Sequence, residues 1–269
     1  FNSIFKIRRL ILQEKVISAS LYFDIICGIL KIFTKFDWWI RESNSAKSKI
    51  YIKNKIRSYL GIRANGIISN SKSGYNYWRK YNNNCKLIFN GYPDSLLNSN
   101  NKKNIKKENA IIASRFVSHK NIYQSIDVFI KLRELGFVEK LLIFGDGPLK
   151  YKLINYIQNC KFKKYINFKG QKSHQKILEE FRYSKALISM SDYEGTPNVA
   201  IEALSNNCQL FLSNSDSHKD FFSSKLVNFV NLNNLSFKIT KKNNKDIKNF
   251  LKECRISNTM KEYKSFLEI

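Results

Sequence analysis

Short apolar runs alternate with amphipathic segments from residue 110 onward. Five runs are apolar enough to form buried strands, and segments with apolar residues every three or four positions lie between or after them. Repeated strand–helix units predict a parallel sheet covered by helices on both faces, which binds ligands at the carboxyl ends of its strands. The apolar runs are 110–114, 140–144, 166–168, 185–190 and 209–213, and the helical patterns are 122–135, 149–159, 174–183, 197–206 and 217–222.

The part of the chain before residue 90 has a less regular pattern of the same kind. Turn residues at 90–94 and an almost wholly polar stretch at 98–109 predict a domain boundary near Asn90. Two further helical patterns close the chain. The strand candidates are 36–40, 64–71 and 86–89, the early helical patterns are 48–60 and 74–81, and the closing ones are 246–254 and 259–267.

The apolar run 16–33 raises the question of a membrane span. It contains Asp24 and Lys31, and it is shorter than the roughly 20 residues that a spanning helix needs. We therefore expect a buried strand and helix in this region.

The composition narrows the class of protein. A chain of 269 residues with 43% hydrophobic residues can bury a proper core, which excludes disorder throughout. The net charge of +26 is spread over a chain rich in Lys, Asn and Ile, which indicates biased composition. A basic surface for membrane or nucleic acid is the alternative. The five cysteines form no Cys-x-x-Cys pair and the three histidines are isolated, so we expect reduced thiols and no structural metal.

The stretch 193–203 carries the strongest candidate chemistry. Glu194 follows an apolar run, Thr196 is a candidate N-cap with Pro197 at the first helical position, and Glu202 lies one turn after Asn198. A strand end, a Gly turn and a helix N-terminus can together hold an anion or a polar ligand. The alternative is an ordinary strand-to-helix turn with two solvated glutamates.

Two other loops follow predicted strands on the same edge. Arg115 and Lys120 lie five residues apart and could hold a diphosphate, although two surface cations are the alternative. The turn 145–148, Gly-Asp-Gly-Pro, is not a Gly-x-Gly-x-x-Gly fingerprint, so nicotinamide or flavin binding is not supported. The chain contains no Asp-x-Asp, the metal-binding motif of one class of nucleotide-sugar enzymes.

These motifs together resemble a known family. Arg115 with Lys120, the turn 145–148, the segment 168–170 and the segment 194–203 with both glutamates agree in order and spacing with the donor domain of family 4 retaining glycosyltransferases (glycosyl transferases group 1). The resemblance is strongest over 110–222 and fair over 38–93.

The resemblance implies an α/β chain of the GT-B fold: a Rossmann-like parallel-sheet donor domain and the remaining part of a second Rossmann-like, acceptor domain. The implied domains are 1–90 for the truncated acceptor domain, 91–252 for the nucleotide-sugar domain, and 253–269 for a closing helix. The Gly-rich N-terminal loop and the acceptor-side His of such enzymes have no counterpart in this sequence.

The resemblance also implies roles for individual residues. Arg115 and Lys120 would stabilise the departing diphosphate, Glu194 would hold the donor sugar, and Glu202 would bind the ribose. The implied catalytic residues are Arg115, Lys120 and Glu194, and the implied donor-binding residues are Gly145, Gly195, Thr196, Pro197, Asn198, Val199 and Glu202.

We therefore expect a glycosyltransferase that moves a hexose-type sugar from a nucleotide-diphosphate sugar to an envelope glycan or lipid-linked acceptor. Retention of configuration and independence of metal and cofactor are part of that expectation. The expected location is cytoplasmic, at the inner face of the membrane, with peripheral contact to anionic lipid and no nucleic-acid partner. The alternatives are a donor-binding but inactive fragment and a basic nucleic-acid-binding protein.

Overall fold

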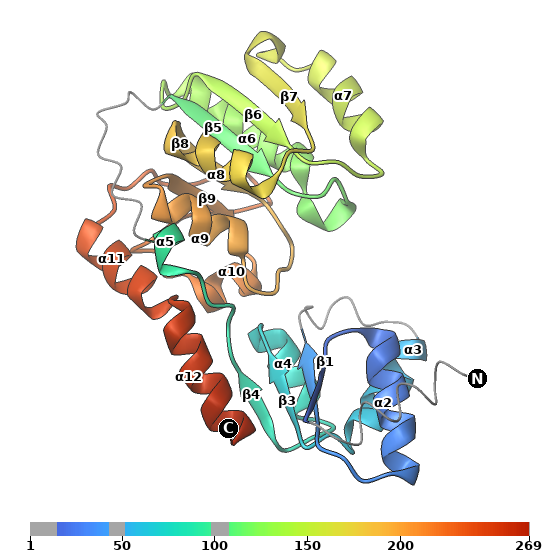
Figure 1. Cartoon of the computed structure of the whole chain (residues 1–269). Helices are drawn as coiled ribbons and strands as arrows, with labels where there is room; N and C mark the ends of the chain where they lie inside the picture. Colours follow the sequence, from blue (N-terminus) through green and yellow to red (C-terminus); the bar gives the residue numbers. More distant parts are fainter. Residues whose placement is uncertain (1–14, 43–51, 98–107, 269) are drawn as a thin grey trace. The chain divides into compact units, whose positions relative to one another are not determined.

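The computed structural model describes residues 15–42, 52–97 and 108–268, and these residues form two compact units (Figure 1). Unit 1 contains the described residues up to Asn90, together with Glu194–Thr196 and those from Thr259 onward. Unit 2 contains Gly91–Tyr193 and Pro197–Asn258. The assignment of an acceptor and a donor role to these parts of the chain stays a prediction.

Unit 1 is built on a four-stranded parallel sheet in the order β1-β2-β3-β4. Each strand pairs with the next one in the chain, with Ile40 opposite Ile67 at its centre. Helices connect successive strands, as parallel pairing requires. The elements are β1 (Val16–Ser18), α2 (Leu21–Phe33), β2 (Trp38–Glu42), α3 (Ile52–Gly61), β3 (Gly66–Ser69), α4 (Lys72–Trp78) and β4 (Cys85–Leu87), and α12 (Ile256–Leu267) ends the described chain.

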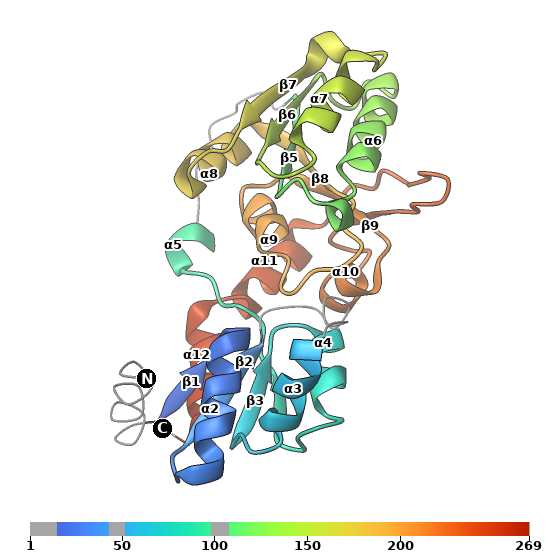
Figure 2. The same cartoon turned by 90° about the vertical axis from the view of Figure 1, so that its right-hand side faces the viewer.

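Alternating side chains of β2 divide the core of unit 1 between the two faces of its sheet. Trp38 packs with Cys27 of α2 and Trp78 of α4 on one face. Trp39 packs with Leu267 of α12 on the other face. Figure 2 shows α2 and α3 along the same sheet from a second direction.

Unit 2 is built on a six-stranded parallel sheet in the order β10-β9-β8-β5-β6-β7. The chain enters at β5 in the middle, adds β6 and β7 on one side, and then returns to add β8, β9 and β10 on the other. The point between β5 and β8 is therefore the topological switch point, outside which doubly wound sheets bind ligands. The strands are β5 (Asn109–Ala113), β6 (Lys140–Phe144), β7 (Ile166–Gly170), β8 (Ser184–Ser189), β9 (Gln209–Ser213) and β10 (Asn228–Val230).

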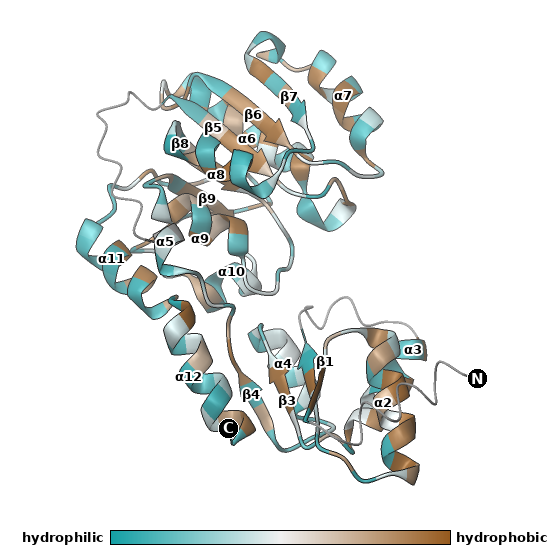
Figure 3. Cartoon of the chain, viewed as in Figure 1, coloured by the Kyte–Doolittle hydropathy of each residue, from teal (hydrophilic) through white to brown (hydrophobic). Residues whose placement is uncertain are grey.

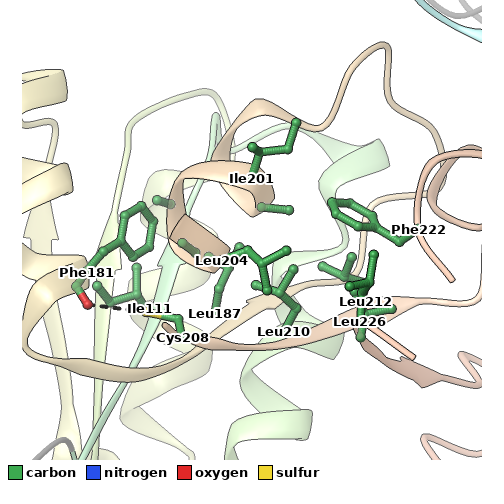
Figure 4. Close-up of a cluster of buried hydrophobic side chains, with 14 of the residues drawn as sticks. Ile111, Phe181, Leu187, Ile201, Leu204, Cys208, Leu210, Leu212, Phe222 and Leu226 are labelled. Carbon is green, nitrogen blue, oxygen red and sulfur yellow. Dashed lines mark hydrogen bonds between the residues drawn. The ribbon is translucent and has the colours of Figure 1, made fainter. Parts of the chain in front are cut away.

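Helices cover both faces of this sheet. On one face Ile201 and Leu204 of α9 pack against Leu187 and Leu210 of the central strands (Figure 4). On the other face α6 and α7 pack on the opposite side chains of the same strands. The helices are α5 (Asp94–Leu97), α6 (Ile122–Glu134), α7 (Lys150–Gln158), α8 (His174–Arg182), α9 (Asn198–Ser205), α10 (Asp216–Phe221) and α11 (Asn244–Glu253), with 3-10 turns η2 (Ser118–Lys120) and η3 (Lys163–Tyr165).

The helix predicted within 16–33 is present as α2, but the prediction that it is buried is wrong in part. Phe33 is 79% exposed and Ile32 is 50% exposed. Among the described residues, no helix has the length and apolar character that a membrane crossing requires. The start of the helical pattern at 48–60 and most of the polar stretch 98–109 lie outside the described residues.

Candidate functional site

The loop after β5 carries the two predicted phosphate-binding cations. Arg115 lies just beyond the carboxyl end of β5 and is exposed, and Lys120 ends the short η2 turn and is half-buried. Backbone bonds from Val117 to Arg115 and from Lys120 to Val117 keep the loop tight. Both cations therefore lie at the carboxyl edge of the sheet, beside its switch point, where doubly wound sheets generally bind ligands.

Asn121 ties this loop to the loop after β8. Its backbone is left-handed, with φ of 46°, a conformation that Asn tolerates better than most residues. Its Nδ2 donates to Met190 O at 3.0 Å and to Asp192 Oδ1 at 2.6 Å. The amide of Asp192 in turn donates to His119 O at 2.9 Å. Two loops far apart in sequence are thereby held together.

Ring stacking adds to this connection. The rings of His119 and Tyr193 are stacked, with centroids 4.5 Å apart and planes 12° from parallel. Tyr193 immediately precedes Glu194, so the stack positions the last residue of unit 2 before the predicted sugar-binding segment.

The loop after β6 depends on two glycines. Gly145 and Gly147 have φ of 137° and 153°, in the region that favours glycine. A Cβ on Gly145 would lie 1.9 Å from Ser114 O, and one on Gly147 would lie 2.7 Å from Phe116 O. This loop therefore packs directly on the loop after β5, which only glycine at these positions allows.

Asp146 lies between these glycines and stiffens the turn. Its Oδ1 accepts from Gly147 N at 2.8 Å, and its Oδ2 lies 3.3 Å from Lys150 Nζ. The bond from Gly147 and, after it, the bond from Lys150 lower the pKa of Asp146. The carboxylate is thus used inside its own loop.

The predicted N-cap of the helix after β8 is wrong by one residue. The structure begins α9 at Asn198, with Pro197 as the capping residue. Thr196 does not cap the helix, because its Oγ1 accepts from Asn90 N at 3.1 Å and donates to Asn70 O at 3.2 Å. Thr196 groups with unit 1, as do Glu194 and Gly195.

The first turn of α9 keeps a polar residue at the surface. Asn198 is exposed and Val199 is half-buried. The hydroxyl of Tyr92 donates to Asn198 Oδ1 at 2.5 Å. Burial raises the pKa of Tyr92, so this hydroxyl keeps its proton and remains a donor. The side chain of Asn198 is therefore oriented by a residue more than a hundred positions away.

Glu202 is buried, which rules out the alternative of two solvated glutamates. Its side chain is 9% exposed, and its Oε1 lies 2.9 Å from Nε2 of His174 on α8. Burial raises the pKa of Glu202, and the hydrogen bond and charge of His174 act against that rise. A buried carboxylate with one polar partner at a sheet edge is suited to accept hydrogen bonds from hydroxyl groups.

The structure brings several of the predicted residues to one edge of unit 2. Arg115, Lys120 and Gly145 lie in loops that contact one another, and Asn198 and Glu202 lie on the helix after β8. The grouping of Glu194 with the two cations in one site stays a prediction, as do the roles of all these residues. Across the described residues, no group of three His, Cys, Asp or Glu side chains could hold a metal ion.

Three residues of this region were missed by sequence reasoning. Asn121 had a signal, since an Asn between a loop and a helical pattern often takes the left-handed conformation. Tyr92 and His174 had none, because their partners Asn198 and Glu202 lie far away in the sequence.

Comparison with known proteins identifies the fold family of this site. The family profile of Glycosyl transferases group 1 matches residues 97–230. The chain contains a Glycosyl transferases group 1 domain. An uncharacterized glycosyltransferase of Methanocaldococcus jannaschii is 31% identical over 192 residues, which are 65% of this chain and 47% of that protein. The poly(glycerol-phosphate) alpha-glucosyltransferase of Bacillus subtilis is 33% identical over 104 residues, which are 38% of this chain and 15% of that protein. This chain spans less than half of the length of these relatives.

Solved structures match more of the chain than the group 1 domain alone. A glycosyltransferase from Rickettsia africae has a TM-score of 0.77 at 14% identity, covering 99% of this chain and 81% of that one. The lipopolysaccharide outer core galactosyltransferase WaaB has a TM-score of 0.71 at 13% identity, and the match covers 98% of this chain and 78% of that one. The Anabaena protein HepE in complex with UDP has a TM-score of 0.71 at 14% identity, and the match covers 96% of this chain and 73% of that one. The predicted GT-B fold, with two parallel α/β sheets, is confirmed.

Proposed function

We propose that this chain binds a nucleotide-diphosphate sugar at the carboxyl edge of unit 2 and belongs to a glycosyltransferase that transfers the sugar. The observation that carries the proposal is the set of three contacting loops, after β5, β6 and β8, around the switch point. Asn121 joins two of them, and Gly145 lets the third approach. The group 1 domain and the glycosyltransferase relatives support it.

The proposed roles follow where charge develops in the reaction. Arg115 and Lys120 meet the negative charge that builds on the diphosphate as the sugar leaves, which stabilises the transition state. Arg offers a fork of donors and Lys a compact charge, and both suit phosphate oxygens. The two cations would take the place that a metal ion has in other nucleotide-sugar enzymes, so the proposed reaction needs no metal or other cofactor.

The proposed sugar and ribose contacts lie after β8. Glu194 accepts hydrogen bonds from sugar hydroxyls, and the backbone of Gly195, Thr196 and Pro197 approaches the donor. The first turn of α9, with Asn198 and Val199, presents the positive end of the helix dipole to the donor. Glu202 accepts from the ribose hydroxyls. Retention of anomeric configuration is part of the proposal.

The proposed acceptor is an envelope glycan or a lipid-linked glycan, and the proposed donor sugar is a hexose. Two matched proteins support this choice by their names, a poly(glycerol-phosphate) alpha-glucosyltransferase and a lipopolysaccharide outer core galactosyltransferase. An acceptor of this kind would place the reaction at the cytoplasmic face of an anionic membrane, without a nucleic-acid partner.

Calorimetric titration with the nucleotides UDP, ADP and GDP, and with their hexose conjugates, tests donor binding. We expect one nucleotide to bind, with the affinity unchanged by EDTA and reduced roughly tenfold or more in Lys120→Ala. Lys164→Ala is the matched control, because Lys164 is exposed and precedes β7 at the opposite edge of the sheet. Equal affinity in both variants would overturn the phosphate role of Lys120.

Transfer is tested on the complete protein with labelled donor and an extracted lipid-linked glycan fraction. Glu194→Gln should lose most of the turnover while keeping its melting temperature, and Glu139→Gln, at the amino end of β6, should keep both. Donor binding without transfer by residues 1–269 alone would identify this chain as a donor-binding module. Tighter binding to duplex or single-stranded nucleic acid than to any nucleotide diphosphate would overturn the proposal.

A further inference from the structure

Unit 1 exposes apolar side chains along two neighbouring helices. We call this surface the α2–α3 face and define it by Ile29, Ile32 and Phe33 of α2 and Ile52, Ile56 and Tyr59 of α3. These side chains are between 46% and 79% exposed. Their spacing of three, four and seven residues puts them on one outward stripe of each helix. Figure 3 shows the apolar character of α2 along most of its length.

The two stripes belong to one surface because the helices pack closely side by side. A Cβ on Gly28 of α2 would lie 2.5 Å from Cβ of Leu60 on α3, so glycine there allows the close approach. At the start of both helices, Lys53 Nζ donates to the Tyr22 hydroxyl at 3.3 Å and lies 5.3 Å from the centre of its ring.

This surface is exceptional within the described part of the chain. More than half of the exposed large apolar and tyrosine side chains of the described residues lie on α2 and α3 or one residue beyond these helices. Proteins rarely leave apolar groups gathered in this way unless the surface binds something.

The exposed charges on α2 and α3 themselves are basic, and the exposed Asp37, which follows α2, interacts with Lys31. Lys53 and Lys55 of α3 and Arg63 just after it are exposed. The acidic residue of α2 is Asp24, which is fully buried, and α3 contains none. An apolar stripe bordered by Lys and Arg, without acidic groups, is typical of helices that lie in the interface of an anionic membrane.

We propose that the α2–α3 face docks unit 1 on an anionic lipid surface. The isoleucines, Phe33 and Tyr59 enter the boundary between headgroups and acyl chains, and Lys53, Lys55 and Arg63 contact lipid phosphates. The charge pattern favours lipid over a protein partner or a second copy of the chain, because nothing acidic on the face offers a complementary contact. This docking does not depend on the proposed sugar transfer.

Co-sedimentation with vesicles tests the docking, using the complete chain without nucleotide. We expect binding to vesicles of phosphatidylcholine mixed with phosphatidylglycerol and little binding to phosphatidylcholine alone. The variant I32S/F33S and the variant K53E/K55E should each lose roughly tenfold or more of the binding. Added salt should also weaken the binding of the parent protein to the anionic vesicles.

Matched controls come from exposed residues of unit 2. Tyr151→Ser removes a side chain that is 79% exposed on α7, and K163E/K164E reverses two exposed charges on η3. Both should bind vesicles like the parent. A loss equal to that of the α2–α3 variants would mean that overall charge or hydrophobicity drives binding, which overturns the proposal.

Two further measurements on the same variants separate the other occupants of the face. If I32S/F33S lowers the melting temperature by several degrees, the face is covered by another part of the chain and the docking proposal fails. If it converts a dimer into a monomer without changing vesicle binding, the face is a contact between copies, and the proposal fails again. Calorimetric titration with nucleotide should give the parent affinity in every variant, so failure of docking and failure of donor binding are seen separately.

Discussion

Nε2 of His174 lies 2.9 Å from Oε1 of Glu202, and the two side chains differ sharply in exposure. The His174 side chain is 60% exposed, whereas that of Glu202 is 9% exposed. An exposed imidazole on α8 thus orients a buried carboxylate on α9. If Glu202 binds the ribose, His174 is the residue that positions it.

Replacement of His174 tests this positioning. His174→Ala should weaken nucleotide binding by roughly threefold to tenfold, because the loss of one hydrogen bond costs about 1 kcal/mol. His174→Gln keeps a donor on its side-chain amide and should recover part of the affinity. Titration calorimetry measures both, and equal affinities for the parent and His174→Ala would remove His174 from the site.

The raised pKa of Glu202 predicts a dependence of stability on pH. The carboxyl group titrates above its ordinary value of 4.5 in the folded state, because burial disfavours its charge. The folded protein therefore holds this proton more firmly than the unfolded chain, and the corresponding stability is present below 4.5 and lost as the pH rises through the raised pKa. As the pH rises across this range, the melting temperature of Glu202→Gln should rise relative to that of the parent. A constant difference at every pH would contradict the prediction.

Gly145 should not tolerate even a methyl group. A Cβ at this position would lie 1.9 Å from Ser114 O, so Gly145→Ala must displace the loop after β5 or that after β6. We expect a loss of about 3 kcal/mol in the free energy of unfolding, measured by circular dichroism in urea. Gly136→Ala is the control, since Gly136 has φ of 65° with no atom near a Cβ, and should cost about 1 kcal/mol. Similar losses in both would show that the loops do not pack as described.

Asn121 should stabilise the fold through the hydrogen bonds of its side chain rather than through its left-handed backbone. Asn121→Gly keeps the left-handed conformation but removes the bonds to Met190 and Asp192, at a cost of about 1 to 2 kcal/mol. Asn207→Gly is the matched control, because Asn207 is also left-handed, with φ of 59°, and is exposed. Urea unfolding compares the two. An equal change in unfolding free energy in both variants would show that the Asn121 hydrogen bonds between the loops do not stabilise the fold.

The central strands of unit 2 could be predicted closely from the sequence. The runs 140–144 and 209–213 coincide with β6 and β9. Strands buried on both faces carry unbroken apolar runs, which makes them easy to recognise. β10 was missed, because a three-residue edge strand has too few positions to show a period. The exposed face of α2 was not predicted, because a helix that is apolar all round reads as buried.

The candidate site was predictable only where its chemistry is local. The loops of Arg115 and Gly145 follow recognisable strands, so their place at the sheet edge could be predicted. Thr196 reads as a helix cap, yet its hydroxyl is taken by Asn70 and Asn90. Such competition arises from contacts between distant parts of the chain and leaves no local pattern.

Unit 1 contains a buried cluster of three charged side chains. Arg57 Nε lies 2.5 Å from Asp24 Oδ2, and its Nη1 lies 2.7 Å from Glu42 Oε2. The indole of Trp78 also donates to Glu42, at 3.0 Å. The three charged side chains are at most 7% exposed, so one buried guanidinium pairs with two buried carboxylates.

Arg57→Met should cost about 3 to 5 kcal/mol of unfolding free energy at neutral pH, because it removes the buried guanidinium that pairs with both carboxylates. Burial already raises the pKa of Asp24, and loss of Arg57, which lowers it, should raise it further. The folded variant then binds a proton more readily than the unfolded chain, so its deficit should shrink as the pH falls toward 3.8, the ordinary value. Tryptophan fluorescence in urea reports on unit 1 alone, since all three tryptophans of the chain lie there.

Two controls keep this prediction decisive. Arg63→Met removes an exposed arginine just after α3 and should change the stability by less than about 0.5 kcal/mol. Arg57→Lys keeps the charge but not the fork of donors, so its loss should lie between those of the other two variants. This order still tests the cluster if Arg57→Met does not fold. Equal losses for Arg57→Lys and Arg63→Met would show that the guanidinium geometry does not matter.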